Sequence, residues 1–389
     1  SYISRAAKYV HLDKELETLI SLFKSLSIYT YPELSKEFEE IMELEAIGTI
    51  SDLMPMTGEN RLIVKKGLKL LSKKPMMPLQ YLLAKQNMIG RPLTAHDISY
   101  KIAPVLNAAG RMGAPDKAVE FLLSEDRSKS EILADQLLNL NVQRQKSEEQ
   151  ALSQIKDIAQ ESYDELGHRF ILIEDDGIPR GLTGTLSSKL SNEYDVPVLV
   201  LASMQEGRVS ASMRCKDPWN ARDFLSDFSY LFEDYGGHRY AAGFSMNIIN
   251  KDEFMSSVKE KILSSPEEEK KEVTIDADAE IPPEYMNLDI WNLNRYMEPF
   301  GQENVPLKLY IKDAVIEDAY CLGSNPKHLR LMLRFGRYSW PALWWNCYNR
   351  EEFFKGRHVS LVFSPDINYW KGEGREQILV SEMEPLVDM

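Results

Sequence analysis

The stretch Tyr-Gly-Gly-His-Arg-Tyr-Ala-Ala-Gly at residues 235–243 holds two adjacent glycines, a histidine and three small residues. Glycine has no Cβ, so Gly236 and Gly237 permit positive φ and a close approach of the backbone to a ligand. Main-chain N–H groups in such a turn form a concavity that binds anions. His238 follows at once, so the stretch predicts a phosphate-binding corner with an imidazole directed into it. The alternative is a plain Gly-Gly turn before a strand, with His238 exposed, and the stretch alone favours neither interpretation.

The composition is that of an ordinary soluble globular protein with several domains. The chain has 389 residues, of which 43% are hydrophobic and 27% are charged, and this length predicts two to four domains. No apolar run is long enough to span a membrane, and residues 1–5 lack the apolar core of a secretory signal. The three cysteines are too few and too scattered for a disulfide framework or a zinc site. We therefore expect a reducing, cytoplasmic setting.

The net charge is −14, which excludes a protein that coats nucleic acid by bulk positive charge. It does not exclude a nuclease, because a local basic groove is sufficient to bind a strand and a carboxylate metal site adds negative charge. The first residue is Ser1 rather than Met, so the sequence is expected to be a fragment or a processed product.

Apolar periodicity predicts helices in the first part of the chain. Residues 15–46 form two amphipathic helices, residues 59–71 another, and residues 130–160 one long helix that could bridge two domains. Residues 47–50 are predicted as a short buried strand that ends at Asp52.

Strands and helices alternate in the middle of the chain. A strand at 170–174, a helix at 181–194 and a strand at 196–201 predict a parallel unit with the helix packed on the sheet. Further strands are expected at 208–213 and 244–248, and further helices at 219–228 and 254–263.

A highly charged linker at residues 264–273 precedes a β-rich region. Five strand candidates follow within about 80 residues, which predicts a small closed barrel of the oligonucleotide-binding (OB) type. The candidates lie at residues 307–315, 328–335, 339–345, 358–363 and 377–383.

Three stretches in this order resemble the later motifs of the RecJ-type nucleases of the DHH phosphoesterase family. They are residues 45–61, with Gly48-Thr49-Ile50-Ser51-Asp52, then Asn107-Ala108-Ala109-Gly110-Arg111, and then the Gly-Gly-His stretch. The resemblance covers nearly the whole chain and implies an α/β fold built from several domains. The implied parts are the end of a DHH domain (1–125), a bridging helix (126–162), an α/β DHH-associated substrate-binding domain (163–263), the linker (264–273) and a five-stranded OB-like nucleic-acid-binding domain (274–389).

The resemblance implies a two-metal site that binds Mn²⁺ or Mg²⁺, with Asp52 as a catalytic metal ligand. An aspartate that only caps a turn is the alternative. The family's Asp-His-His triplet is absent from this sequence, and the chain is expected to begin just after it. Since one carboxylate cannot hold two metal ions, we expect that this polypeptide alone does not hydrolyse DNA.

The resemblance also implies phosphate contacts. Arg111, with Asn107 one turn before it, is expected to grip a substrate phosphate near the 5′ end, because a guanidinium binds phosphate with two prongs. A structural arginine that bonds loop carbonyls is the alternative. Ser212 and Arg214 alternate on one face of a strand and are expected to contact backbone phosphates, although a solvent-facing pair is an open alternative. His238, with Gly236 and Gly237, is expected to be a catalytic residue that donates to a phosphate oxygen near the metal ions, opposite Arg111. The glycines of residues 181–190 are interpreted as packing a helix closely on a sheet.

In the predicted barrel, Arg330 and Arg334 alternate with apolar residues and are expected to bind nucleic acid. Trp340, Trp344, Trp345 and Tyr348 follow; exposed aromatic rings stack on bases, but half or more of these are expected in the barrel core.

The leading hypothesis is the C-terminal portion of a single-strand-specific 5′→3′ exonuclease of DNA repair and recombination, with single-stranded DNA as its partner. A non-catalytic single-strand-binding module is the alternative, as is half of a split nuclease that acts with a separately encoded DHH segment. A nanoRNase or phosphatase of the same superfamily is disfavoured, because those small enzymes lack the barrel.

Overall fold

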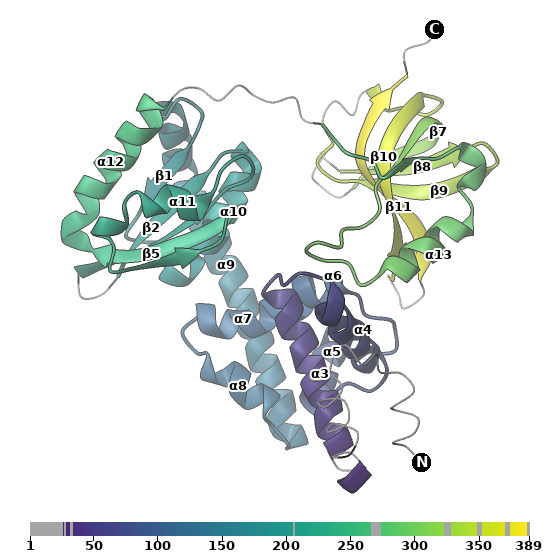
Figure 1. The fold of residues 1–389 in the computed structure, drawn as a ribbon, viewed down its shortest axis with the longest axis horizontal. Coiled ribbons are helices and arrows are strands. Elements are labelled where there is room, and N and C mark those ends of the chain that lie inside the picture. The colour runs from purple at the N-terminus through teal and green to yellow at the C-terminus, as the bar shows by residue number, and fades with distance from the viewer. Residues whose placement is uncertain are drawn as a thin grey trace, which may run out of the picture. The chain divides into compact units, whose positions relative to one another are not determined.

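The structure is a computed structural model that describes residues 26, 29–31, 34–204, 207–265, 274–322, 328–347, 352–369 and 374–386. The chain divides into two compact units, one of residues 104–272 and one of residues 1–103 with 273–389 (Figure 1). The predicted first helix and most of the predicted linker lie outside the described residues. None of the described helices has the length and apolar character needed to cross a membrane.

The N-terminal part of the first unit is helical. Gly67 brings two of its helices together, because a Cβ there would lie 2.3 Å from the Cβ of Ala46. The α-helices of this part are α3 (Leu34–Ser51), α4 (Gly58–Lys73), α5 (Met77–Lys85) and α6 (Ala95–Asp97).

The strand predicted at residues 47–50 is wrong. These residues are the last turn of α3, and Ala46, Ile47 and Ile50 form its buried face. Buried residues three and four apart follow the helical period, which a run of only four residues does not reveal. Leu53 has a φ of 52° just after the helix, so Asp52 lies in an exposed turn, where its N–H donates to Gly48 O at 2.9 Å.

Glu43 is a buried carboxylate on α3. Its side chain accepts a hydrogen bond from the Met76 N–H at 2.9 Å, only 1% of the residue is exposed, and burial raises its pKa to about 7. Because the folded state holds this proton more tightly than the unfolded chain, folding stability falls as the pH rises from about 4.5 to 7.

Glu43→Gln is therefore expected to raise the free energy of unfolding at pH 8 by up to about 3 kcal/mol, with little gain at pH 4. The amide oxygen still accepts from Met76. Denaturant unfolding at both pH values tests this, with the exposed Glu45→Gln on the same helix as the control. An equal effect of Glu43→Gln at both pH values would contradict the prediction.

The second unit contains a five-stranded sheet with the strand order β1-β2-β3-β5-β4. The predicted parallel unit is confirmed, since β1 pairs with β2 in parallel and α10 connects them; the other pairs are antiparallel. Helices cover both faces: α9 and α10 pack on one apolar cluster and α11 and α12 on the other (Figure 1). The strands are β1 (Ile171–Glu174), β2 (Val198–Met204), β3 (Arg208–Arg214), β4 (Asp234–Gly237) and β5 (Ala241–Asn247).

The long helix predicted before this sheet is confirmed as the 39-residue helix α9. Strand β4 was not predicted from the sequence. The α-helices of the unit are α7 (Ala103–Arg111), whose first residue belongs to the other unit, α8 (Asp116–Leu122), α9 (Arg127–Glu165), α10 (Thr183–Tyr194), α11 (Ala221–Ser226) and α12 (Lys251–Ser264).

The C-terminal region forms the predicted barrel. All five expected strands are present, and pairing of β10 with both β11 and β7 closes the ring. The indole of the buried Trp291 donates to the carbonyls of Asp366 and Gln377 at 3.0 and 3.1 Å, so α13, which was not predicted, is anchored to the barrel. The elements are β6 (Ala279–Glu280), α13 (Leu288–Met297), β7 (Leu309–Cys321), β8 (Leu329–Phe335), β9 (Tyr338–Trp344), β10 (His358–Asn368) and β11 (Arg375–Pro385).

The turn after α13 contacts the helical part of the same unit. The N–H of Met56 donates to Gln302 O at 2.6 Å. The Arg61 guanidinium donates to the carbonyls of residues 296, 297 and 298 at 3.1, 3.0 and 3.3 Å. These carbonyls lie at the end of α13, where a cation is favourable.

Candidate nucleic-acid interface

Ser212 and Arg214 project from the face of β3 that α10 covers. The residue between them, Met213, is fully buried in the opposite apolar cluster, so strand alternation directs both polar side chains toward α10. The hydroxyls of Ser212 and Thr183 lie 2.9 Å apart in a hydrogen bond. The expectation that the two residues share a face is therefore met, and that face meets the first turn of α10.

Arg111 reaches the same turn from the end of α7. Its Nη1 donates to Gly181 O at 3.0 Å. A Cβ on Gly181 would lie 2.4 Å from Arg111 O, and one on Gly184 would lie 2.9 Å from Arg214 Nη2. The two glycines thus pack against the arginines, rather than serving helix–sheet packing alone as predicted. Asn107 is exposed one turn before Arg111 on the same helix face.

We call Arg111, Thr183, Ser212 and Arg214 around the first turn of α10 the anion site. Burial lowers the pKa of Arg111, with a further contribution from Arg144, and burial followed by repulsion from Arg111 lowers that of Arg214. The guanidiniums therefore lie close enough to repel each other. α10 extends the 3-10 turn Arg180–Leu182, in which the Thr183 N–H donates to Arg180 O, and the positive end of the helix dipole lies at this turn. An anion between the guanidiniums would relieve the repulsion, and a phosphate suits this set of donors.

The Gly-Gly-His stretch forms a hairpin beside this face. Gly236 and Gly237 lie in edge strand β4, and His238 occupies the turn to β5, where its N–H donates to Ala241 O at 2.8 Å. Gly237 has a φ of 144°, and Gly236 is absent from the positive-φ glycines. Only one of the two glycines therefore needs the freedom predicted for both, and the pair belongs to a strand rather than to a turn before one.

Strand pairing places His238 near Arg214. Arg214 pairs with Ala241 of β5, and Ala241 in turn accepts the His238 hydrogen bond, so the three residues follow one another from β3 across β5 to the β4–β5 turn. Strands are spaced by roughly 4.8 Å, which brings the His238 backbone within about 10 Å of that of Arg214 on an exposed hairpin.

Asp52 belongs to the other unit. Within the described ranges, no three His, Cys, Asp or Glu side chains group in a way that could hold a metal ion. A two-metal site therefore does not fit the described residues alone.

Arg330 and Arg334 both lie on β8 and are exposed, and the residues between them are buried or partly buried, as predicted. The Nε of Arg334 lies 3.2 Å from a Glu317 carboxylate oxygen. Among the tryptophans, Trp344 is in the core and Trp345 is 50% exposed, which leaves Trp345 available for stacking. Tyr348 lies outside the described residues.

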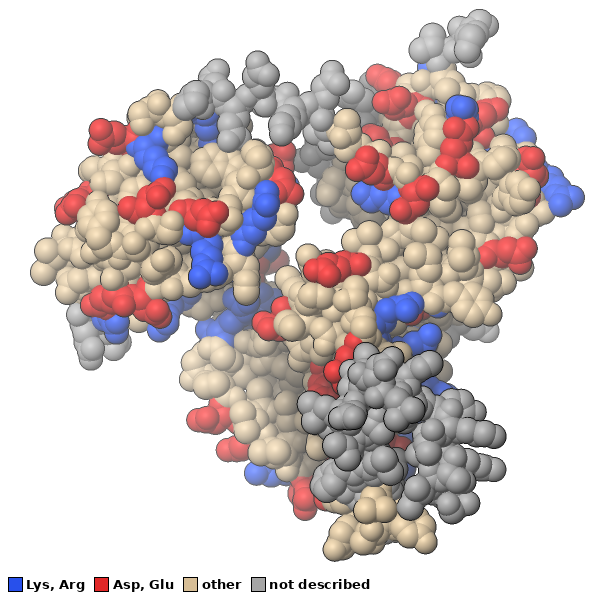
Figure 2. All heavy atoms as spheres, viewed as in Figure 1, with Lys and Arg blue, Asp and Glu red and all other residues tan. Residues whose placement is uncertain are grey.

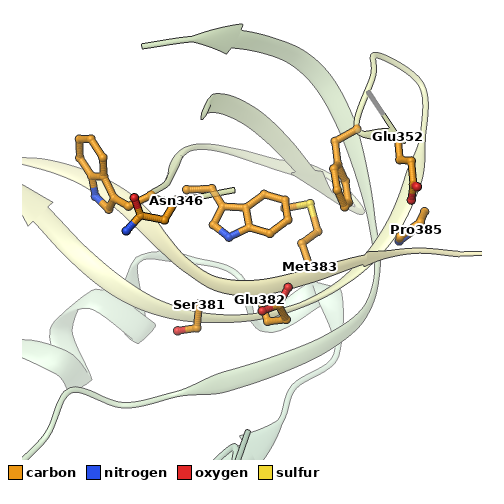
Figure 3. Close-up of a pocket in the computed structure, with 9 residues that line it drawn as sticks. Asn346, Glu352, Ser381, Glu382, Met383 and Pro385 are labelled. Atoms are coloured by element: carbon orange, nitrogen blue, oxygen red, sulfur yellow. The ribbon is translucent and has the colours of Figure 1, made fainter. Parts of the chain in front are cut away.

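A pocket of about 260 Å³ opens beside Trp345 on the barrel. Figure 3 shows Asn346 at one end of it and Glu352 with Pro385 at the other. The carboxylates of Glu352 and Glu382 line it, so it is unfavourable for a phosphate backbone. Over the visible surface, basic and acidic side chains are interspersed (Figure 2), which favours local rather than bulk recognition of a strand.

Thr183 was predicted only as part of a packing helix and not as a member of the site. Its signal was its position between Gly181 and Gly184 at a predicted helix start, where the positive end of the helix dipole favours an anion.

Comparison with known proteins agrees with the expected order of a DHH-associated domain followed by an OB domain. Residues 167–264 match the DHHA1 domain model, and residues 277–382 match the RecJ OB domain model. The single-stranded-DNA-specific exonuclease RecJ of Bacillus subtilis is 28% identical over 348 residues, which cover 88% of this chain and 44% of that protein. RecJ of Haemophilus influenzae is 28% identical over 375 residues, covering 94% and 65%.

Comparison with solved structures also gives a similarity to RecJ. The crystal structure of RecJ in complex with Mn²⁺ from Thermus thermophilus superposes with a TM-score of 0.71 at 25% identity, covering 90% of this chain and 50% of that chain. The chain thus spans only about half to two thirds of the length of these relatives. It is a RecJ homologue that matches the C-terminal portion of these proteins and contains a DHHA1 domain followed by a RecJ OB domain.

Proposed function

We propose that this chain is the strand-binding portion of a single-strand-specific 5′→3′ DNA exonuclease that acts in the cytoplasm in DNA repair and recombination. The observation that carries the proposal is the anion site. Arg111 donates to Gly181 O just before α10, and Arg214, more than a hundred residues later in the sequence, packs on Gly184 in its first turn, where the hydroxyls of Thr183 and Ser212 are hydrogen-bonded to each other.

The anion site would bind a phosphate near the 5′ end of the strand. Two guanidiniums and a helix N-terminus complement a terminal phosphate better than a diester, because the terminal group carries more charge. His238, on the hairpin beside Arg214, would donate to the same phosphate. Arg330 and Arg334 on β8 would contact the following phosphates on the barrel, whereas the carboxylates of Glu352 and Glu382 disfavour a strand at Trp345.

Cleavage would require Mn²⁺ or Mg²⁺, which supplies an activated water and neutralises charge on the phosphate when bound. Asp52 is the residue of this chain that would join that metal site. A DHH segment, in the same polypeptide or separately encoded, would supply the other ligands.

Binding of labelled 12-nucleotide DNA tests the proposal, measured by fluorescence anisotropy. A 5′-phosphorylated single strand is expected to bind about tenfold more tightly than its 5′-hydroxyl counterpart, the difference made by one or two charge-assisted hydrogen bonds. Duplex DNA should bind more weakly than either. Equal affinity for the two single strands would remove the phosphate role of the anion site.

A non-catalytic single-strand-binding module remains the second candidate, because the described residues hold no metal cluster. Joining the chain to a segment that contains Asp-His-His and adding Mn²⁺ separates the two functions. The exonuclease proposal expects mononucleotides to be released from the 5′ end, whereas a pure binding module would leave the strand intact.

A further inference from the structure

Glu148 is a buried carboxylate in the middle of α9, and only 4% of the residue is exposed. Its two oxygens hold two cations from two different helices. Arg144 Nη1, one turn earlier on α9, lies 2.6 Å from Oε2, and Lys189 Nζ of α10 lies 2.7 Å from Oε1. We call these three residues the Glu148 cluster. The Glu148–Lys189 pair joins α9 to α10. Removing one partner of such a buried pair would leave an uncompensated charge.

The Glu148 cluster adjoins the anion site. Lys189 lies on α10 six residues after Thr183, whose helical turn carries the site. Arg144 is close enough to Arg111 to lower the pKa of that guanidinium, an effect that Glu148 opposes. The side chain of Arg144 is only 13% exposed and also donates through Nε to Asn141 Oδ1 at 3.2 Å. Its orientation is therefore fixed from two sides.

We propose that Glu148 is a positioning residue for the anion site. Through Lys189 it holds α10, whose first turn carries the site, in register with Arg111 and Arg214, and it fixes the orientation of the Arg144 side chain on α9. This inference rests on the proposed phosphate-binding function.

Glu148→Gln distinguishes a positioning role from a simple charge effect, because the two would change the affinity for phosphate in opposite directions. The change removes a negative charge next to a phosphate site, so electrostatics alone would tighten phosphate binding. Loss of positioning would weaken it. We expect binding of the 5′-phosphorylated strand to weaken about tenfold, the loss of one charge-assisted hydrogen bond, and binding of the 5′-hydroxyl strand to change less than about twofold.

Glu149→Gln is the matched control. Glu149 is the next residue on the same helix and is exposed, so the variant carries the same charge change without touching the cluster. It should bind both strands as the parent chain does. Unchanged or tighter binding of the phosphorylated strand by Glu148→Gln would overturn the positioning role.

Amide hydrogen exchange gives a readout that needs no DNA. Exchange at residues 183–186 should be faster in Glu148→Gln than in Glu149→Gln; equal exchange would overturn the inference. If the parent chain binds the 5′-phosphorylated and 5′-hydroxyl strands equally, the proposed function fails. Amide hydrogen exchange at residues 183–186 then still tests whether the Glu148 cluster holds α10 in place. Lys189→Met removes the cluster's more exposed partner, so it should speed the same exchange even if Glu148→Gln does not fold.

Discussion

Gly237→Ala is expected to lower the free energy of unfolding of the DHHA1 domain by about 2 to 6 kcal/mol. Two costs add. A φ of 144° is a conformation that residues with a side chain adopt at roughly 1–3 kcal/mol. The new Cβ would also lie 2.4 Å from the Cα of Ala242 and 2.5 Å from Ala241 O, and overpacking against backbone costs roughly another 1–3 kcal/mol.

Gly236→Ala is the matched control, since no atom lies within 4 Å of a Cβ built there. Its effect should stay within about 1 kcal/mol, the ordinary range for a strand glycine. Urea unfolding of the chain, followed by tryptophan fluorescence, measures both variants. Similar stabilities for the two would show that the hairpin is not shaped by Gly237.

Arg111→Ala is expected to reduce exonuclease activity at least about a hundredfold in a complete enzyme, formed by this chain and an Asp-His-His segment. The guanidinium would contribute one or two charge-assisted hydrogen bonds to the phosphate, each worth about 1.5–3 kcal/mol, and about 2.7 kcal/mol corresponds to a hundredfold. His238→Ala should reduce cleavage as well, because the imidazole would act at the same phosphate.

Arg222→Ala controls for the loss of an arginine, because Arg222 is exposed on α11. It should cleave at the parent rate. Release of the 5′ nucleotide from a 5′-labelled strand in Mn²⁺ is the measurement, and circular dichroism checks the fold of each variant. Parental turnover by both Arg111→Ala and His238→Ala would exclude these residues from the site.

The sequence predicted elements whose apolar pattern repeats several times. Helix α9 has two runs of buried residues at helical spacing, within 130–137 and 148–162, and β8 alternates buried with exposed or partly buried residues along its length. Each added repeat makes the period clearer. The four residues 47–50 contain too little pattern, so they were assigned to a strand although they continue a helix. Strand β4 was not predicted, because its two glycines have no side chains that could show an alternating pattern.

The site was predictable in part. Arg111, Ser212, Arg214 and His238 were found from motifs, and the structure brings all four into one unit. The role of Gly184 was not predictable, because it depends on the position of the Arg214 guanidinium. The partner of Glu148 on α10 lies 41 positions away in the sequence, and only the packing of two helices brings Lys189 to it. Such pairings are decided by tertiary structure rather than by local sequence.

Closure of the barrel has a consequence for how it can evolve. Pairing of β10 with β7 gives every strand of the ring a neighbour on both sides, so a guest strand finds no open ladder to extend. A polynucleotide can then be recognised there only through side chains and connecting loops. Residues at these positions can be substituted one at a time without disturbing the main-chain hydrogen bonds. The binding preference can therefore change during evolution while the barrel fold is kept.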